Sequence, residues 1–181
     1  MLRIEIVFWM FVFVLASIGF VRGWAREILV TASVVLAYFT IFVLENYIPF
    51  VQGFFSPTES GFIPMSHFWF RFIILLLLLF FGYETPSLPR VSGNRFKRDN
   101  FRDSALGFFL GAINGYLILG SVWGFLAQAG YQPPFDKYII PDFSQRAMEL
   151  YAKLPPNWMM DAPLIYIAVI LAFLFVIAVF V

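Results

Sequence analysis

The sequence predicts an all-α fold, a polytopic bundle of transmembrane helices, and three observations lead to this fold class. Hydrophobic residues make up 61% of the 181 positions, and charged residues make up only 13%, whereas charged residues alone are about a quarter of a typical soluble chain. The mean hydropathy is +0.84. Apolar runs long enough to cross a hydrocarbon core as helices fill most of the chain, so we expect one compact membrane domain.

We predict five membrane spans separated by polar segments that carry charges and turn-forming residues. The predicted spans cover about 4–21, 28–44, 68–83, 104–127 and 162–181. The first apolar run has the length of a signal peptide, but only Arg3 precedes it, whereas Arg22 and Arg26 follow it. This charge order is the reverse of that in a signal peptide, so we expect the first run to be retained as a span.

Basic residues gather in two short segments that a five-span arrangement places on the same side of the membrane. The first connector holds Arg22 and Arg26, and the 84–103 segment is also basic. Its lysine and arginine residues are Arg90, Arg95, Lys97, Arg98 and Arg102. The 45–67 segment on the opposite side has no lysine or arginine. The positive-inside rule therefore predicts an N-terminus outside the cytoplasm and a C-terminus inside it.

The 142–154 segment is predicted to form an external amphipathic helix that lies along the membrane surface. Asp142 follows a proline and precedes Gln145 by three residues, which is a variant of the capping box. Apolar residues then recur on one helix face. These residues are Phe143, Ala147, Leu150, Tyr151 and Leu154. Two interpretations stay open, a plain connection between the last two spans or a surface that docks a partner.

Three glycines in the fourth span, Gly107, Gly111 and Gly115, recur at steps of four. Each step returns to nearly the same helix face, so the glycines form a groove in which a second helix backbone can approach closely. We predict that they pack helices together. Another span of the same chain is the favoured partner, and a second copy of the chain in a homo-oligomer is the alternative.

Three polar side chains lie within or at the ends of the apolar runs. Asn114 is expected to form an interhelical hydrogen bond, to Thr31, to Ser33 or to a freed backbone carbonyl, with a polar path as the alternative. Glu27 begins the second span and is expected to pair with Arg22, with Arg26 or with a base of the 90–102 loop; the alternative is a protonatable group at a gate. Arg71 is expected to extend its side chain toward the headgroups.

Two motifs occur in order, R-G-x-x-R-E over 22–27 and D-x-x-L-G-x-x-x-G-A-x-x-G over 103–115, and I-I-P-x-F follows at 139–143. Together they resemble the colicin V production protein (CvpA) family of bacterial inner-membrane proteins. The resemblance implies a CvpA-like domain over 1–161, with 162–181 as an additional C-terminal transmembrane helix.

The resemblance also implies a function and a set of candidate functional residues. It implies a non-enzymatic factor of the bacterial cytoplasmic (inner) membrane that supports bacteriocin production or export, or envelope homeostasis, with export-machinery proteins as partners. The candidate residues are Arg22, Gly23, Arg26, Glu27, Asp103 and Asn114. Asn114 stands where the family often has a basic residue, and the fifth span is absent from four-span relatives.

The residue types that most catalytic chemistry needs are scarce. The chain has no cysteine, and His67 is its one histidine, so we expect no thiol catalysis, histidine-paired serine, metal site or cofactor. We therefore predict no enzymatic activity. The basic segment is better suited to anionic lipid than to nucleic acid. A small channel or transporter subunit, either monomeric or oligomeric, is the alternative function.

Overall fold

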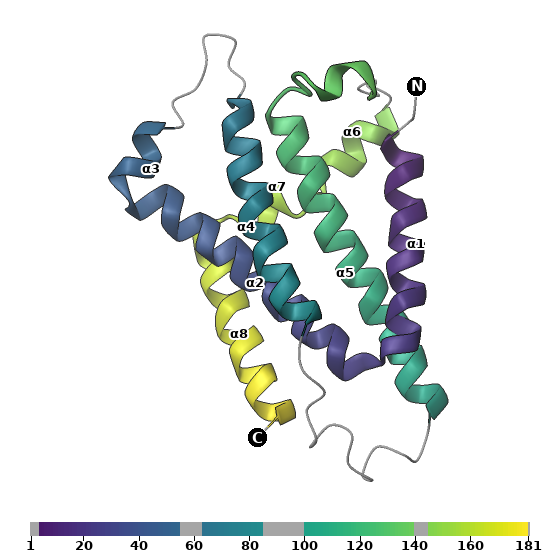
Figure 1. Ribbon diagram of the computed structural model, residues 1–181. Helices are drawn as coiled ribbons and strands as arrows, with labels where there is room; N and C mark the ends of the chain where they lie inside the picture. Colours follow the sequence, from purple (N-terminus) through teal and green to yellow (C-terminus); the bar gives the residue numbers. More distant parts are fainter. Residues whose placement is uncertain (1–3, 55–62, 85–99, 140–144, 181) are drawn as a thin grey trace.

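The structure is a computed structural model that describes residues 4–54, 63–84, 100–139 and 145–180. These residues form helices, without a β-strand among them (Figure 1). The helices are α1 Ile4–Arg22, α2 Trp24–Tyr47, α3 Pro49–Phe54, α4 Met65–Tyr83, α5 Asn100–Gln128, the 3-10 helix η2 Phe135–Lys137, α6 Gln145–Ala152, α7 Pro156–Met159 and α8 Ala162–Phe180. The predicted all-α fold class is confirmed.

Four of these helices, α1, α2, α4 and α5, are long and apolar enough to cross a membrane. The count rises to five if the segment from α6 to α8, which bends by 71° before α8, is taken as one broken span. These lengths are consistent with a multi-pass membrane protein. The four long helices coincide with the first four predicted spans, although α2 begins at Trp24 and therefore earlier than expected.

Helix α5 lies at the centre of the arrangement. It packs along α1 on one side and along α2 on the other, while α4 contacts both α2 and α5, and α8 packs on α2. Helices α2 and α5 run in the same direction, opposite to α1, α4 and α8 (Figure 1). Among the described helices, α2 and α5 thus form a parallel pair, and each of the other long helices packs on one or both of them.

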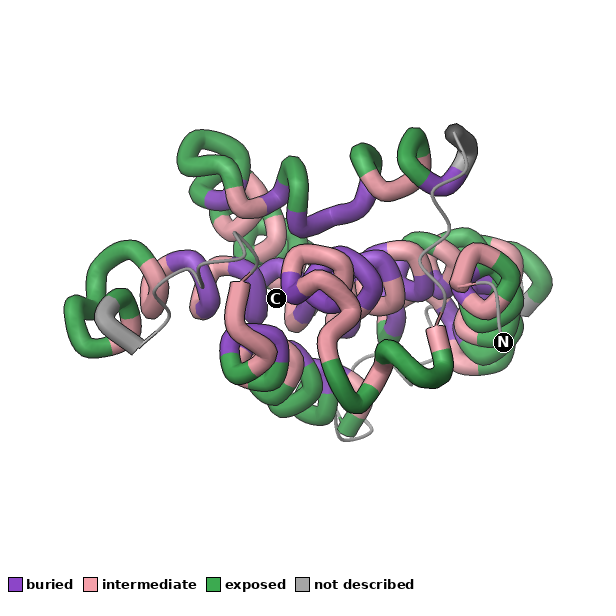
Figure 2. The backbone as a smooth tube through the Cα atoms, turned by 90° about the horizontal axis from the view of Figure 1, so that it is seen from above, coloured by how far each residue is buried: buried purple, intermediate pink, exposed green. Residues whose placement is uncertain are grey.

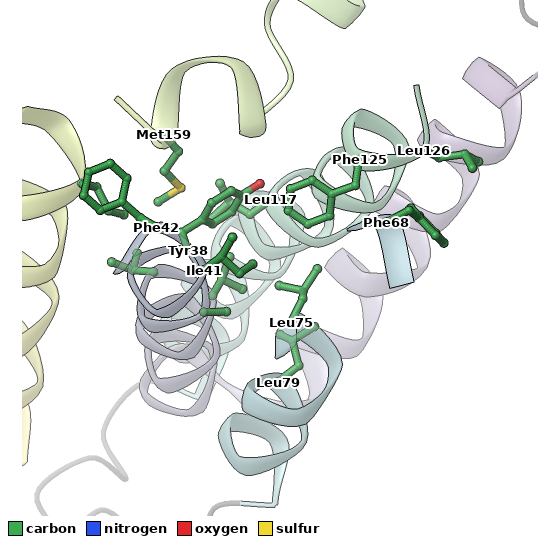
Figure 3. Packing of buried hydrophobic residues seen from close by; sticks show 14 of the residues in the cluster. Tyr38, Ile41, Phe42, Phe68, Leu75, Leu79, Leu117, Phe125, Leu126 and Met159 are labelled. Atoms are coloured by element: carbon green, nitrogen blue, oxygen red, sulfur yellow. The ribbon is translucent and has the colours of Figure 1, made fainter. Parts of the chain in front are cut away.

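The main apolar core lies where α2, α4 and α5 meet. Tyr38 and Ile41 of α2, Leu75 of α4 and Phe125 of α5 are fully buried, and Met159 of α7 covers one end of the cluster (Figure 3). Residues on the outer helix faces are exposed (Figure 2), and many of them are large and apolar. An apolar exterior around a packed interior is what a lipid environment permits.

Helix α6 and the residues after it only partly match the predicted surface helix. Residues 142–144 lie outside the described part of the chain, and α6 ends at Ala152. Two tight turns follow, in which Lys153 and Leu154 donate to carbonyls three residues earlier, each at 3.0 Å. Leu154 is fully buried in a cluster with Phe8 of α1 and Trp123 of α5. The apolar side of this segment thus packs on the bundle.

Two prolines that follow α6, Pro155 and Pro156, shape both the next helix and its contact with α5. Pro156 opens α7, because its fixed φ suits the first turn of a helix. A Cβ added to Gly120 would lie 2.6 Å from Pro155 Cδ, and one added to Gly124 would lie 2.7 Å from Pro156 Cγ. The two prolines therefore fill the space left by these α5 glycines.

The residues that follow α5 stay close to the bundle through an aromatic contact. The Trp123 indole N–H donates to the Tyr131 hydroxyl at 2.9 Å. Burial raises the pKa of Tyr131, and this effect outweighs the opposing effect of the hydrogen bond from Trp123. The phenol therefore remains neutral at physiological pH and accepts this hydrogen bond.

Candidate functional site

The three predicted packing glycines of α5 lie against α1 of the same chain. A Cβ at Gly111 would lie 2.6 Å from the carbonyl oxygen of Leu15 and 3.0 Å from Gly19 Cα. A Cβ at Gly115 would lie 3.0 Å from Val12 Cα, and one at Gly107 would meet the carbonyl oxygen of Gly19. The obstacles are backbone atoms, which cannot turn aside as a flexible side chain can. The favoured intramolecular pairing is thus the one that the structure contains.

The turn between α1 and α2 depends on Gly23. Its backbone angles, φ 84° and ψ 160°, lie in a region that is nearly restricted to glycine. Gly23 is the N-cap of α2 and has no side chain to accept a hydrogen bond. Asp103, in the first turn of α5, supplies that acceptor: its Oδ1 receives the Trp24 N–H at 3.4 Å. This cap from a neighbouring helix explains why α2 already begins at Trp24.

We expect Gly23→Ala to destabilise the fold more than Asp103→Ala. The added Cβ would lie 2.7 Å from Asp103 Oδ2, and the backbone conformation itself costs a non-glycine residue about 1–3 kcal/mol. Loss of the Asp103 cap should cost about 1 kcal/mol. Thermal unfolding of the purified variants in detergent measures both effects.

The double variant Gly23→Ala, Asp103→Ala separates the two causes of the Gly23 effect. It should remain less stable than Asp103→Ala, because removing the carboxylate relieves the contact but leaves the strained backbone. Recovery to the stability of Asp103→Ala would show that the close contact, rather than the φ angle, is responsible.

Glu27 lies at the centre of a buried polar cluster beside this turn, which we call the Arg22–Glu27 node. Glu27 Oε1 lies 3.2 Å from Arg22 Nη1, and Glu27 is 1% exposed. The Asn114 amide donates to Glu27 Oε2 and to the Glu27 backbone carbonyl, both at 2.8 Å. The Thr31 hydroxyl donates to Asn114 Oδ1 at 2.7 Å. The node therefore joins the α1–α2 turn to the middle of α5.

The Arg22 side chain also reaches α4. Its guanidinium carbon lies 4.3 Å from the centre of the Tyr83 ring, and Nη2 donates to the Tyr83 carbonyl at 3.4 Å. Stacking on an aromatic face fixes the orientation of a guanidinium and also attracts its positive charge to the ring. Through Arg22 the node contacts the end of α4 as well as α1, α2 and α5.

The structure brings together five of the six candidate functional residues. Arg22, Gly23, Glu27, Asp103 and Asn114 all lie at this end of the bundle. The sixth, Arg26, is exposed on the outer face of α2 and is not part of the node. Of the partners expected for Glu27, Arg22 pairs with it in the structure. Of those expected for Asn114, Thr31 and the backbone carbonyl of Glu27 bond to it. Most bases of the 90–102 loop lie outside the described residues.

A second polar cluster, the Glu45–Arg71 node, lies at the other end of α2. Arg71 donates from Nε and Nη2 to the two oxygens of Glu45, at 2.7 and 2.8 Å, and from Nη1 to Gln128 Oε1 at 2.5 Å. His67 Nε2 lies 2.7 Å from Glu45 Oε1. The prediction that Arg71 extends toward headgroups is wrong: the side chain turns inward because a bidentate carboxylate partner compensates its charge.

The two nodes belong to one polar seam between α2 and α5. Thr31 bonds Asn114, and Tyr38 bonds Ser121 at 2.5 Å. Both pairs are separated by 83 positions in the sequence, and so are Glu45 and Gln128, which Arg71 links. A constant offset requires parallel helices, and steps of seven keep the polar residues on the facing sides.

Sequence reasoning missed the middle and far parts of this seam. Tyr38, Glu45, Ser121 and Gln128 were not selected as candidates. A signal for them was present, since 31, 38 and 45, in and directly after one predicted span, and 114, 121 and 128, in and directly after another, show the same spacing of seven. Polar residues at matched heptad positions in two predicted spans would have predicted the parallel pair.

Two cavities between the helices are lined by residues that belong to neither node. One of ≈ 420 Å³ lies between α1, α4 and α5 and is lined by apolar side chains that include Phe8, Trp69 and Phe72. Another of ≈ 290 Å³ lies between α2, α4 and α8. No residue of the Arg22–Glu27 node lines either cavity. Within the described ranges, no group of three His, Asp or Glu side chains could hold a metal ion.

The fold and its two nodes define the class as an all-helical protein with several helices suited to spanning a membrane. Comparison with known proteins adds no family to this class, because no protein-family profile, curated protein or solved structure matches the chain.

Proposed function

We propose that this chain is a CvpA-like protein of the bacterial inner membrane, a non-enzymatic factor that supports bacteriocin export or envelope homeostasis. The observation that supports the proposal is the convergence of both sequence motifs on one buried node. Arg22 and Glu27 of the first motif and Asp103 and Asn114 of the second bond to each other or to the turn. Groups that pair with one another in this way hold the fold together, and Arg22 Nη1 and Glu27 Oε1 meet at 3.2 Å as an ion pair without a hydrogen bond.

In the proposed topology the chain crosses the membrane five times, with its N-terminus outside and its C-terminus in the cytoplasm. Helix α8 is the fifth span, and the α6–α7 segment packs along the external half of α5, where Pro155 and Pro156 contact Gly120 and Gly124. Two facts support this arrangement. The α1–α2 turn and the start of α5, which carry Arg26 and Arg102, lie at the same end of the bundle, and α8 is apolar throughout.

Two surfaces remain for partners in this proposal. On the cytoplasmic side Arg26 is exposed beside the buried node, where it would contact anionic headgroups or a protein of the export machinery. On the external side Met148 and Trp158 are 55% and 39% exposed on the α6–α7 segment. Large apolar side chains at such a surface suit a protein partner.

A channel or transporter is the second candidate, and the polar seam is the observation that favours it. The seam places polar groups at both ends and in the middle of the α2–α5 contact. Against conduction, apolar residues separate its three pairs, including the fully buried Val34 and Ile41 of α2. Protons or ions would need water in these layers, so we rank this function second.

One experiment pairs secretion with flux. A bacterial host that exports a colicin V-type peptide is deleted for its CvpA-like protein and complemented with this chain, with Arg26→Ala or with Lys137→Ala as a matched exposed control. We expect the unsubstituted protein and Lys137→Ala to restore secretion. Arg26→Ala should give several-fold less secretion than the unsubstituted protein at equal membrane abundance. Proteoliposomes of the folded protein should show no ion flux above empty vesicles.

Failure of the chain to restore secretion or envelope integrity would count against the export-factor proposal. Ion flux that Tyr38→Phe or Ser121→Ala alters would instead establish a path along the seam. Equal secretion by Arg26→Ala and the original chain would remove Arg26 from the partner surface.

A further inference from the structure

The Glu45–Arg71 node continues as a hydrogen-bonded chain to the α6–α7 segment. Beyond the bond from Arg71 to Gln128, Gln128 Nε2 donates to Asn157 Oδ1 at 3.4 Å. Asn157 Nδ2 in turn donates to the Tyr151 carbonyl of α6 at 2.6 Å. The chain of contacts thus runs from His67 on α4 through α2 and α5 to α7 and α6. It is a direct polar connection between the only histidine and a short, bent segment.

The charges at this node depend on that histidine. The titratable or charged groups are Glu45 and Tyr38 from α2, the latter close enough to Arg71 to interact with its charge, and His67 and Arg71 from α4. Helices α5 and α7 contribute the neutral amides of Gln128 and Asn157. With neutral His67, Glu45 and Arg71 balance each other. Histidine is the side chain that ordinarily changes charge between about pH 5 and 8.

We propose that the node is a pH-sensitive latch that holds the α6–α7 segment on the bundle and loosens when His67 is protonated. His67 Nε2 and Arg71 Nε lie at the same distance, 2.7 Å, from the same oxygen, Glu45 Oε1. A protonated His67 places two cationic donors on this oxygen, and the side chains of both are only 9% exposed. The node then carries one uncompensated positive charge in a poorly hydrated site, which is unfavourable.

The consequence passes outward through Gln128. Arg71 Nη1 orients the Gln128 amide by bonding its oxygen, and the same amide donates to Asn157. Displacement of Arg71 from Glu45 would release this orientation. The Gln128–Asn157 hydrogen bond is the longest of the series that runs from His67 to Tyr151, so it is the one that should separate first. Loss of this contact leaves α7 held by its packing against α5 and α8.

The absence of cysteine from the chain makes a single-cysteine labelling experiment direct. Ala147→Cys lies on the inward side of α6, where Ala147 is 3% exposed, and Met148→Cys is an exposed neighbour. The ratio of their maleimide labelling rates cancels the intrinsic effect of pH on thiol reactivity. Detergent-solubilised protein exposes both ends of the bundle, so the test does not depend on the proposed topology or function.

We expect the ratio of Ala147→Cys to Met148→Cys labelling to rise at least five-fold from pH 8 to pH 5.5. His67→Gln keeps a hydrogen-bond donor without a titratable group, and it should hold the ratio at its pH 8 value. Glu45→Gln should raise the ratio at both pH values. A ratio that stays flat in otherwise unchanged protein, or that rises equally with His67→Gln, would overturn the proposal.

A distance measurement covers the case in which Ala147→Cys does not fold. Spin labels at two exposed positions, Met148 on α6 and Ile73 on α4, report the separation of α6 from the bundle. The distance distribution should broaden toward longer values at pH 5.5 and remain unchanged when His67→Gln is added. Identical distributions at both pH values would refute the latch.

Discussion

Replacing Gly111 with leucine should separate α1 from α5 and cost more stability than any substitution on the lipid-facing side of α5. The Cβ alone would lie 2.6 Å from the Leu15 carbonyl oxygen and 3.1 Å from Ala16 Cα. Because these are backbone atoms of a helix, the whole of α1 must move to admit the side chain. Overpacking of a fitted interior costs about 1–3 kcal/mol when side chains can adjust, so we expect the upper part of that range or more.

Thermal unfolding in detergent measures this effect, with Gly111→Ala as an intermediate step. Ala105→Leu is the matched control, since Ala105 borders an open cavity with Phe20 and Phe108 and has room for the added carbons. We expect Gly111→Leu to lower the unfolding temperature strongly, Gly111→Ala to lower it less, and Ala105→Leu to leave it nearly unchanged. Equal unfolding temperatures for Gly111→Leu and Ala105→Leu would show that α1 does not pack against this glycine.

The sequence predicted the α1–α5 contact well because close helix packing restricts residue size at every turn. Only residues without side chains allow two helix backbones to approach this closely. Glycines that recur every four residues therefore indicate the contact directly. The four long helices were equally predictable, since their lengths follow from the thickness of a hydrocarbon core. The partners of Glu27 and Asn114 were among those expected, because a buried polar group has few partners within reach.

The inward turn of Arg71 was not predictable in the same way. An arginine near the end of a span can reach the headgroups or a buried carboxylate, and sequence position alone does not distinguish the two. The choice depends on whether α2 places Glu45 beside it, which is a property of helix packing. The fit of Pro155 onto Gly120 is likewise a tertiary contact. Neither residue type nor spacing indicates which proline fills which glycine.

Glu27 and Glu45 show how one helix face serves both ends of the bundle. They are 18 positions apart on α2, which corresponds to five full turns, so both lie on the same helix face. Each carboxylate pairs with an arginine from a different helix, Arg22 of α1 or Arg71 of α4. The parallel α2–α5 pair is thereby tied to α1 at one end and to α4 at the other.

Glu27→Leu should produce the second large effect, because it leaves a poorly exposed cation without its partner. The Arg22 side chain is 17% exposed, and loss of one member of a buried ion pair typically costs about 3–5 kcal/mol. Glu27→Gln should cost less, since its amide oxygen can still accept from Asn114. Glu84→Gln removes a carboxylate from an exposed position at the end of α4 and serves as the control.

The double variant Arg22→Leu, Glu27→Leu should regain much of the stability that Glu27→Leu loses. Removing both charges eliminates the desolvation cost of each, and apolar replacements of a buried ion pair are often neutral. Asn114 would not be left unsatisfied, because it keeps the Glu27 backbone carbonyl and the Thr31 hydroxyl as partners. Unfolding temperatures of the two single variants and the double variant form a cycle that isolates the pair. A double variant less stable than Glu27→Leu would mean that Arg22 stabilises the bundle mainly through Tyr83, and that its pairing with Glu27 is secondary.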